Sequence, residues 1–121
     1  MMTLIEALQI ENVSLTKSGF KANMNLGQFH EQPQGFVNGG AVLAFAEIVA
    51  GYASNLLEKG KYGAVGQSIA GNHMKTLKAE RKLYAKGELL HRGEKTHVWS
   101  VRMEDCKGNL TSIITITNVL I

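Results

Sequence analysis

The sequence contains one cysteine, Cys106, and one proline, Pro33, among 121 residues. A single cysteine cannot form an internal disulfide, which favours a reducing compartment, so we expect a cytoplasmic protein. The N-terminus lacks the basic segment and apolar run of a secretory signal peptide. Long hydrophobic runs are also missing: the most apolar stretch, residues 39–52, contains Glu47 and is too short to cross a membrane.

Charge and composition narrow the class of protein further. Thirteen Lys and Arg against ten Asp and Glu give a formal net charge of +3. This excess is too small to indicate nucleic-acid binding, although it fits a modest attraction to an anionic ligand. Hydrophobic residues form 45% of a chain without repeats or linkers, so we expect one folded domain over residues 1–121. No His, Cys and carboxylate set has metal-site spacing, and we expect neither a metal nor a cofactor.

The N-terminal half predicts two helices separated by a hairpin. Thr3 and Glu6 have the spacing of a capping box, which indicates a short helix. Apolar residues then alternate with polar ones, as in a pair of strands. Asn38 is a good N-cap for a long apolar helix. The predicted elements are a helix over residues 4–9, a hairpin over 12–26, a loop over 30–37 and a helix over 39–57.

The C-terminal half predicts strands alone, with turns at residues 91–94 and 105–109. The predicted strands cover residues 65–76, the segment beginning at 82, the segment around Trp99, Val101 and Met103, and residues 110–121. Because no second long helix separates these strands, their pairing should be antiparallel. We therefore predict an α+β fold in which a curled antiparallel sheet surrounds one central helix. Such a sheet leaves part of the helix and a strand edge uncovered, which favours a second chain as their cover.

The start of the long helix is a candidate site for polarising a carbonyl group. A helix N-terminus offers free backbone N–H groups and the positive end of the helix dipole. Gly39 and Gly40 let a ligand approach this backbone closely, and Gln32 supplies a neutral donor from the preceding loop. Taken singly, a glycine pair and a glutamine are equally compatible with tight packing.

Glu47 is a lone carboxylate among apolar helix residues. An unpaired buried carboxylate is costly, so Glu47 should meet solvent in a cleft or a partner group. It follows Gly39 by eight residues, about 12 Å along a helix axis, which is too far for one small reacting group to touch both. If the two cooperate, Glu47 comes from a partner subunit. If they do not, Glu47 is a solvated surface charge.

The stretch HEQPQGFVNGGAVLAFAE, residues 30–47, resembles the signature of the hotdog-fold acyl-CoA thioesterases. It is most similar to the branch that acts on 4-hydroxybenzoyl-CoA and 1,4-dihydroxy-2-naphthoyl-CoA, which includes phenylacetic-acid-pathway enzymes. Gly71-Asn72-His73 and His91-Arg92-Gly93, followed by Val98-Trp99, are similar to later motifs of the family. The resemblance extends over almost the whole chain.

The resemblance implies a role for each residue of the signature. Gln32 would orient the thioester carbonyl, the N–H of Gly39 would polarise it, and Glu47 of the other subunit would act as nucleophile or general base. Two positions depart from the pattern, since Asn38 stands where the branch has histidine and Gly51 where a Ser or Thr often holds water. Asn38 joins the catalytic set because it can still cap the helix and donate a hydrogen bond. The implied substrate-binding residues are His30, Gly40, Gly51, Ser54, His73, His91, Arg92 and Gly93.

The function predicted from the sequence is hydrolysis of an acyl-CoA to a free acid and coenzyme A. An aromatic acyl group is favoured, with 1,4-dihydroxy-2-naphthoyl-CoA as the leading candidate. The predicted assembly is a homodimer with shared active sites, further associated into a homotetramer, without nucleic acid or membrane as partner. The alternatives are a non-catalytic acyl-CoA-binding or sensing domain, a thioesterase for short- or medium-chain acyl-CoA, and a hotdog hydratase or dehydratase, which the asparagine at position 38 disfavours.

Overall fold

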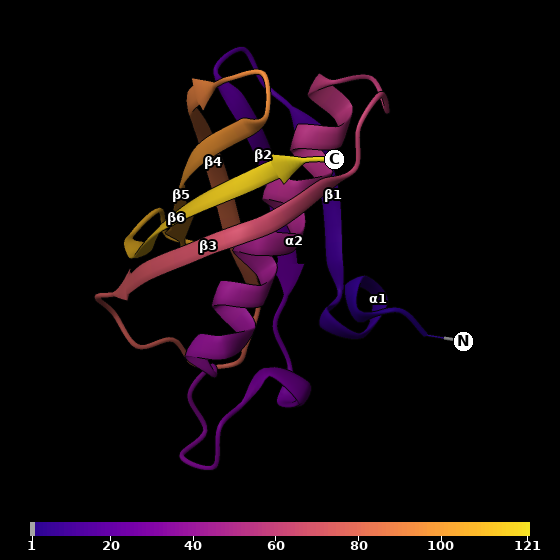
Figure 1. Cartoon of the computed structure of the whole chain (residues 1–121). Helices are drawn as coiled ribbons and strands as arrows, with labels where there is room; N and C mark the ends of the chain where they lie inside the picture. The colour runs from indigo at the N-terminus through magenta and orange to yellow at the C-terminus, as the bar shows by residue number, and fades with distance from the viewer. Residues whose placement is uncertain (1) are drawn as a thin grey trace.

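The computed structural model describes residues 2–121, and Figure 1 shows one long helix against a curled sheet. The capping box of Thr3 and Glu6 is present at the first helix, as predicted. The predicted order of two strands, one long helix and four strands is also confirmed. The elements are α1 (Leu4–Leu8), β1 (Ile10–Leu15), β2 (Gly19–Asn25), the 3₁₀ helix η1 (Gln28–His30), α2 (Gly39–Leu57), β3 (Ala64–His73), β4 (Lys82–Arg92), β5 (Thr96–Glu104) and β6 (Leu110–Leu120).

The six strands form one sheet in the order β1-β2-β4-β5-β6-β3. Every neighbouring pair is antiparallel, as predicted. β3 crosses over to pair with β6, so the edges of the sheet are β1 and β3. The predicted α+β fold, a curled antiparallel sheet around one helix, is therefore confirmed.

α2 begins and ends where the sequence predicts. The side chain of Asn38 caps it by accepting a hydrogen bond from the N–H of Gly40 at 2.9 Å. One face of the helix packs on the sheet, where the largest buried side chains include Trp99 and Phe20. The buried helix residues are Val42, Phe45, Ala46, Val49, Ala50, Ala53 and Ser54.

α2, with 19 residues, has the length and apolar character of a membrane span. Phe45, Ala46 and Val49 nevertheless have no exposed surface, because they are packed into the core beneath the sheet. α2 is therefore the core helix of this fold.

β3 ends at His73, three residues before the predicted end. The N–H groups of Met74 and Lys75 both point to the carbonyl of Thr111, at 2.8 and 3.3 Å, so the regular ladder stops there. Beyond it, Val37 donates from its N–H to the carbonyl of Leu77 at 2.8 Å. The segment after β3 thus lies against the loop that precedes α2.

β4 continues to Arg92, although the sequence predicts a turn at residues 91–94. The register with β5 shifts between Leu89 and His91, and both His91 and Arg92 then pair with β5. A register shift of this kind leaves no mark in the alternation of residue types, so the prediction of the boundary was wrong.

Candidate active site

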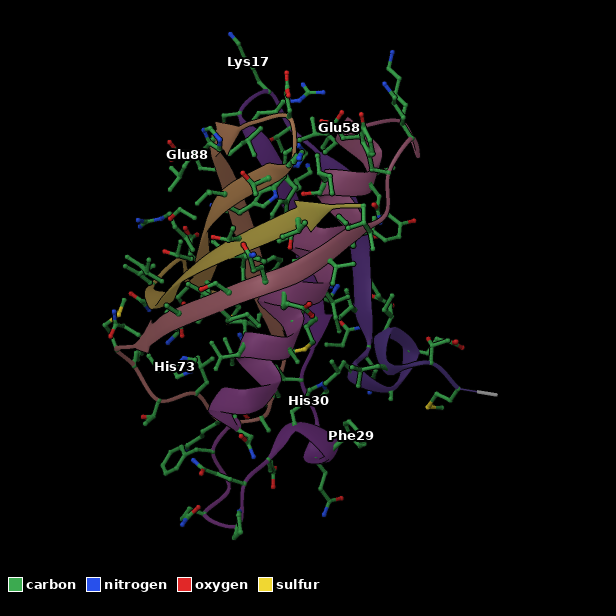
Figure 2. The ribbon with its side chains drawn as sticks, in the orientation of Figure 1. Lys17, Phe29, His30, Glu58, His73 and Glu88 are labelled. Atoms are coloured by element: carbon green, nitrogen blue, oxygen red, sulfur yellow. The ribbon has the colours of Figure 1, made fainter. Side chains whose placement is uncertain are left out.

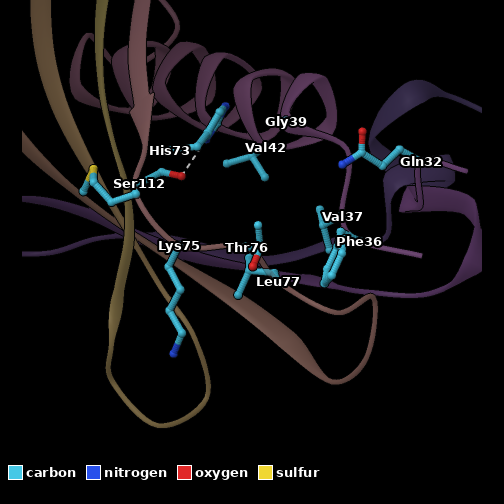
Figure 3. Close-up of a pocket in the computed structure, with 11 residues that line it drawn as sticks. Gln32, Phe36, Val37, Gly39, Val42, His73, Lys75, Thr76, Leu77 and Ser112 are labelled. Carbon is cyan, nitrogen blue, oxygen red and sulfur yellow. Dashed lines mark hydrogen bonds between the residues drawn. The ribbon is translucent and has the colours of Figure 1, made fainter. Parts of the chain in front are cut away.

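A cavity of about 230 Å³ opens at the N-terminal end of α2 (Figure 3). Its walls come from the loop before α2, the first turn of α2, the end of β3 with the segment that follows, and β6. The lining residues are Gln32, Phe36, Val37, Gly39, Val42, His73, Met74, Lys75, Thr76, Leu77 and Ser112. Three residues predicted for the site, Gln32, Gly39 and His73, therefore meet around one hollow.

The first turn of α2 leaves one backbone N–H for a ligand. The carbonyl of Asn38 accepts from the N–H groups of Ala41 and Val42 at 3.0 and 3.4 Å, and its side chain accepts from Gly40. Among residues 2–121 no acceptor is found for the N–H of Gly39, which lines the cavity. Because the positive end of the helix dipole lies here, this N–H can stabilise an oxygen that gains negative charge.

Gly39 packs closely against His73. A Cβ at this position would lie 3.0 Å from both Cδ2 and Nε2 of the His73 ring. The other ring nitrogen, Nδ1, is 2.7 Å from Oγ of Ser112, as the dashed line in Figure 3 marks. The imidazole is thus held between β6 and the start of α2, at the helix end of the cavity.

Glu47 does not line this cavity. Its side chain packs on Gly66 of β3, where a Cβ would overlap the carboxylate. Glu47 is half-buried, and the ion pairs found among residues 2–121 do not include it. Since about 12 Å of helix separates it from Gly39, one chain does not present both to the same reacting group.

His30 and Gly40, both predicted to bind substrate, do not line the cavity. His30 is only 1% exposed, with Nε2 at 2.7 Å from the carbonyl oxygen of Leu8 and Nδ1 at 3.0 Å from the N–H of Gly27. It ties the loop before α2 to α1, which is a structural role. The N–H of Gly40 is already used by the helix cap.

Ser54 lies at the centre of a buried polar network. Its Oγ is 2.8 Å from Nδ1 of His97, 2.9 Å from Nε1 of Trp99 and 3.0 Å from Nδ2 of Asn118. Trp99 and Asn118 donate to Oγ, so the serine hydroxyl has only His97 to which it can donate. With no exposed surface and its hydrogen-bonding positions filled, Ser54 holds the core together and does not reach a substrate.

The same network continues to the C-terminal end of α2. Oε2 of Glu58 is 2.9 Å from Nε2 of His97 and accepts from Nε of Arg92 at 3.0 Å. The hydrogen bond from Arg92, helped by the one from His97 and opposed by desolvation, lowers the pKa of Glu58 below its ordinary value. Serine, histidine and carboxylate in a row resemble a hydrolytic triad, but the buried serine excludes that chemistry. The sequence analysis missed His97 and Glu58.

His91, Arg92 and Gly93 lie far from the cavity in one chain. Figure 2 places Glu58, the ion-pair partner of Arg92, and His73 toward opposite ends of α2. Arg92 also donates from Nη2 to the carbonyl of Leu57 at 3.2 Å, which caps the helix C-terminus. A second, open hollow of about 910 Å³ is lined there by Glu58, Tyr62, Arg92, Gly93, Glu94, Lys95, Val119, Leu120 and Ile121.

Gly51 lies on the open face of α2, where a Cβ would meet nothing within 4 Å. Tyr52 and Leu56 on the same helix are 49% and 42% exposed. β3 is similarly open, with Val65 49% and Ile69 44% exposed. An apolar helix surface and an apolar strand edge are thus uncovered in the single chain.

The chain belongs to the Thioesterase superfamily, whose pattern matches residues 34–112, from the loop before α2 into β6. The hotdog-type fold and the free N–H at the start of the core helix agree with this membership. Together with the relatives described next, it defines the protein as a thioester hydrolase.

Three relatives illustrate the similarity. The solved structure of “putative thioesterase yhdA” from Lactococcus lactis is 44% identical and superposes with a TM-score of 0.96, covering 99% of this chain and 98% of that one. “Putative esterase ComA2” of Bacillus subtilis is 37% identical over 112 residues, 92% of this chain and 88% of its own. The “1,4-dihydroxy-2-naphthoyl-CoA hydrolase” of Escherichia coli K12 is 29% identical over 101 residues, 84% of this chain and 74% of its own.

Proposed function

We propose that this thioesterase hydrolyses an aromatic acyl-CoA, with 1,4-dihydroxy-2-naphthoyl-CoA as the leading candidate. The observation that carries the proposal is the N–H of Gly39, for which no acceptor is found among residues 2–121. Gly39 lines the cavity at the positive end of α2, together with Gln32. The similarity to a 1,4-dihydroxy-2-naphthoyl-CoA hydrolase supports the choice of acyl group. The reaction needs no cofactor, because coenzyme A enters as part of the substrate.

The proposed reaction begins with the thioester carbonyl oxygen accepting a hydrogen bond from the N–H of Gly39, while the amide of Gln32 orients it. Glu47 of the partner subunit either attacks the carbonyl carbon or takes a proton from an attacking water. Both routes place negative charge on the carbonyl oxygen, which the helix N-terminus stabilises. The C–S bond then breaks, the coenzyme A thiolate takes up a proton, and the acyl group leaves as the acid. If Glu47 attacked directly, water hydrolyses the resulting anhydride.

The proposed assembly is a homodimer in the cytoplasm that associates into a homotetramer. The open face of α2 and the edge strand β3 support it, because exposed apolar strand edges recruit a further strand. Two copies of α2 side by side and antiparallel would bring Glu47 of one chain toward Gly39 of the other. The site would then occur twice in each dimer.

Arg92 remains our candidate for a phosphate of coenzyme A, with His91 and Gly93 beside it. A guanidinium has five N–H donors, and Glu58 and Leu57 occupy only two of them. Lys95 lines the same hollow and adds a second positive charge. In the dimer or tetramer this end of α2 would serve the cavity of another subunit.

The proposed function is tested by measuring free-thiol release from a panel of aromatic, short-chain, medium-chain and long-chain acyl-CoAs. We expect the highest kcat/KM with 1,4-dihydroxy-2-naphthoyl-CoA and lower values with unbranched acyl chains. Faster thiol release from short- or medium-chain acyl-CoAs would show that the substrate carries such an acyl chain and not an aromatic group. Tight binding of acyl-CoA without thiol release would make the protein a binding domain and refute the proposed function.

A further inference from the structure

Ser112 is a buried serine whose hydroxyl faces the proposed active site. It is 2% exposed and lines the cavity beneath α2. In the ladder between β3 and β6 it is paired with His73, so both side chains project to the same side of the sheet, toward α2. Its Oγ lies 2.7 Å from Nδ1 of His73.

This contact determines which part of the His73 ring faces a ligand. With Nδ1 held by Ser112, the edge formed by Cδ2 and Nε2 points to Gly39, 3.0 Å from where a Cβ would be. The Nε2 atom therefore lies beside the helix turn whose free N–H binds the thioester oxygen in the proposed function. A larger residue at position 39 would press on the ring there.

We propose that Ser112 is a positioning residue for thioester hydrolysis, holding His73 so that Nε2 donates a second hydrogen bond to the carbonyl oxygen bound at Gly39. A hydroxyl can donate or accept, so Ser112 keeps the ring in place in either neutral tautomer. Negative charge that develops on the thioester oxygen selects the tautomer with hydrogen on Nε2, in which Ser112 donates to Nδ1. This inference rests on the proposed function.

Thr111, the preceding residue of β6, provides a matched control. It is equally buried, but its hydroxyl donates to the carbonyl of Met103 at 3.1 Å, away from the cavity. Thr111→Val removes this structural hydrogen bond but keeps the contact between Ser112 and His73. The comparison separates positioning of the ring from general stability of the strand.

The test is a double-mutant cycle on kcat for acyl-CoA hydrolysis, with folding checked by circular dichroism. His73→Ala should lower kcat about 100-fold, since loss of one oxyanion donor costs about 10²–10³-fold. Ser112→Ala should lower kcat about tenfold at nearly constant KM, and Ser112→Thr, which keeps the hydroxyl, should restore it. In the His73→Ala background, Ser112→Ala should have no further effect, because the two residues act as a unit.

Three outcomes would overturn the inference while leaving the proposed function in place. These are a wild-type kcat in Ser112→Ala, a tenfold loss that persists in the His73→Ala background, and an equal loss in Thr111→Val. A wild-type protein that releases no thiol from any acyl-CoA would refute both the proposed function and this role for Ser112.

Discussion

Glu47 is a carboxylate that the single chain holds half-buried without an ion-pair partner among residues 2–121. Gly66 makes room for it on β3, since any larger residue there would overlap the carboxylate. This packing places the carboxylate against β3, and the role of Glu47 as base or nucleophile stays a prediction.

Glu47→Gln should lower kcat by at least about 100-fold, because general base catalysis contributes about 10²–10⁴-fold and the amide keeps only the shape of the side chain. The fold should survive, and Glu88→Gln on the exposed face of β4 should keep wild-type activity. Steady-state thiol release measures the activity of each variant, and circular dichroism measures its fold. Near-full activity in Glu47→Gln would make this carboxylate dispensable.

Ser54→Ala should destabilise the protein without directly altering the cavity. The substitution leaves Trp99, His97 and Asn118 without their shared partner inside the core. A buried group that loses its hydrogen bond costs about 1–3 kcal/mol, and three groups lose theirs here, so we expect the free energy of unfolding to fall by at least about 3 kcal/mol. Urea denaturation measures this, with the exposed Ser18→Ala as control. Equal stability of the two variants would refute the structural role of Ser54.

At the scale of elements, one stripe of α2 lies along β3. Residues 39, 43 and 47 are spaced by four and share a helix face. Each of these helix residues contacts one residue of β3. In every pair one of the two residues is a glycine, so the helix and the strand lie close together. The contacts are Gly39 with His73, Leu43 with Gly71, and Glu47 with Gly66. This stripe places the N-terminal end of α2 and the carboxylate beside the same open sheet edge.

The turn between β5 and β6 should respond to acid through Asp105. Its carboxylate accepts hydrogen bonds from Nζ of Lys75 and from Asn109, which hold its pKa well below the ordinary 3.8. A lowered pKa in the folded state adds stability above about pH 4, and that stability is lost as the pH falls further. The melting temperature of wild type should exceed that of Asp105→Asn at pH 7, and the gap should shrink between about pH 4 and pH 2. A gap independent of pH would contradict this.

The sequence predicted elements whose signals are local. Asn38 as a cap and the apolar run behind it predicted α2 with the correct bounds, and alternation predicted the strands. The buried network was missed because it depends on tertiary contacts, although His97 shares the inward-facing alternation of Trp99. The resemblance to the thioesterases placed Ser54, one turn after Gly51, among the implied substrate-binding residues. Burial, which decides its role, depends on how β5 and β6 pack on the helix.

At the scale of the whole molecule, the open edge of β3 should be where two chains meet. Ile69→Lys places a charge on this apolar edge and should shift the protein toward monomers, with loss of activity because each site then lacks Glu47 of its partner. Thr115→Lys, on an exposed position of β6, should remain a dimer or tetramer. Sedimentation velocity at micromolar concentration measures the assembly state of each variant. A wild-type protein that is monomeric and active would contradict the shared site.

The most direct test of the shared site mixes two inactive chains, one carrying Glu47→Gln and the other Gln32→Ala. In a mixed dimer, one site receives both intact residues and the other receives neither. Because half of the dimers in an equimolar mixture are mixed, activity should return to roughly one quarter of wild type. Mass spectrometry of differently tagged chains establishes whether mixed dimers form. If they form and no activity returns, Glu47 and Gln32 do not act across the subunit boundary.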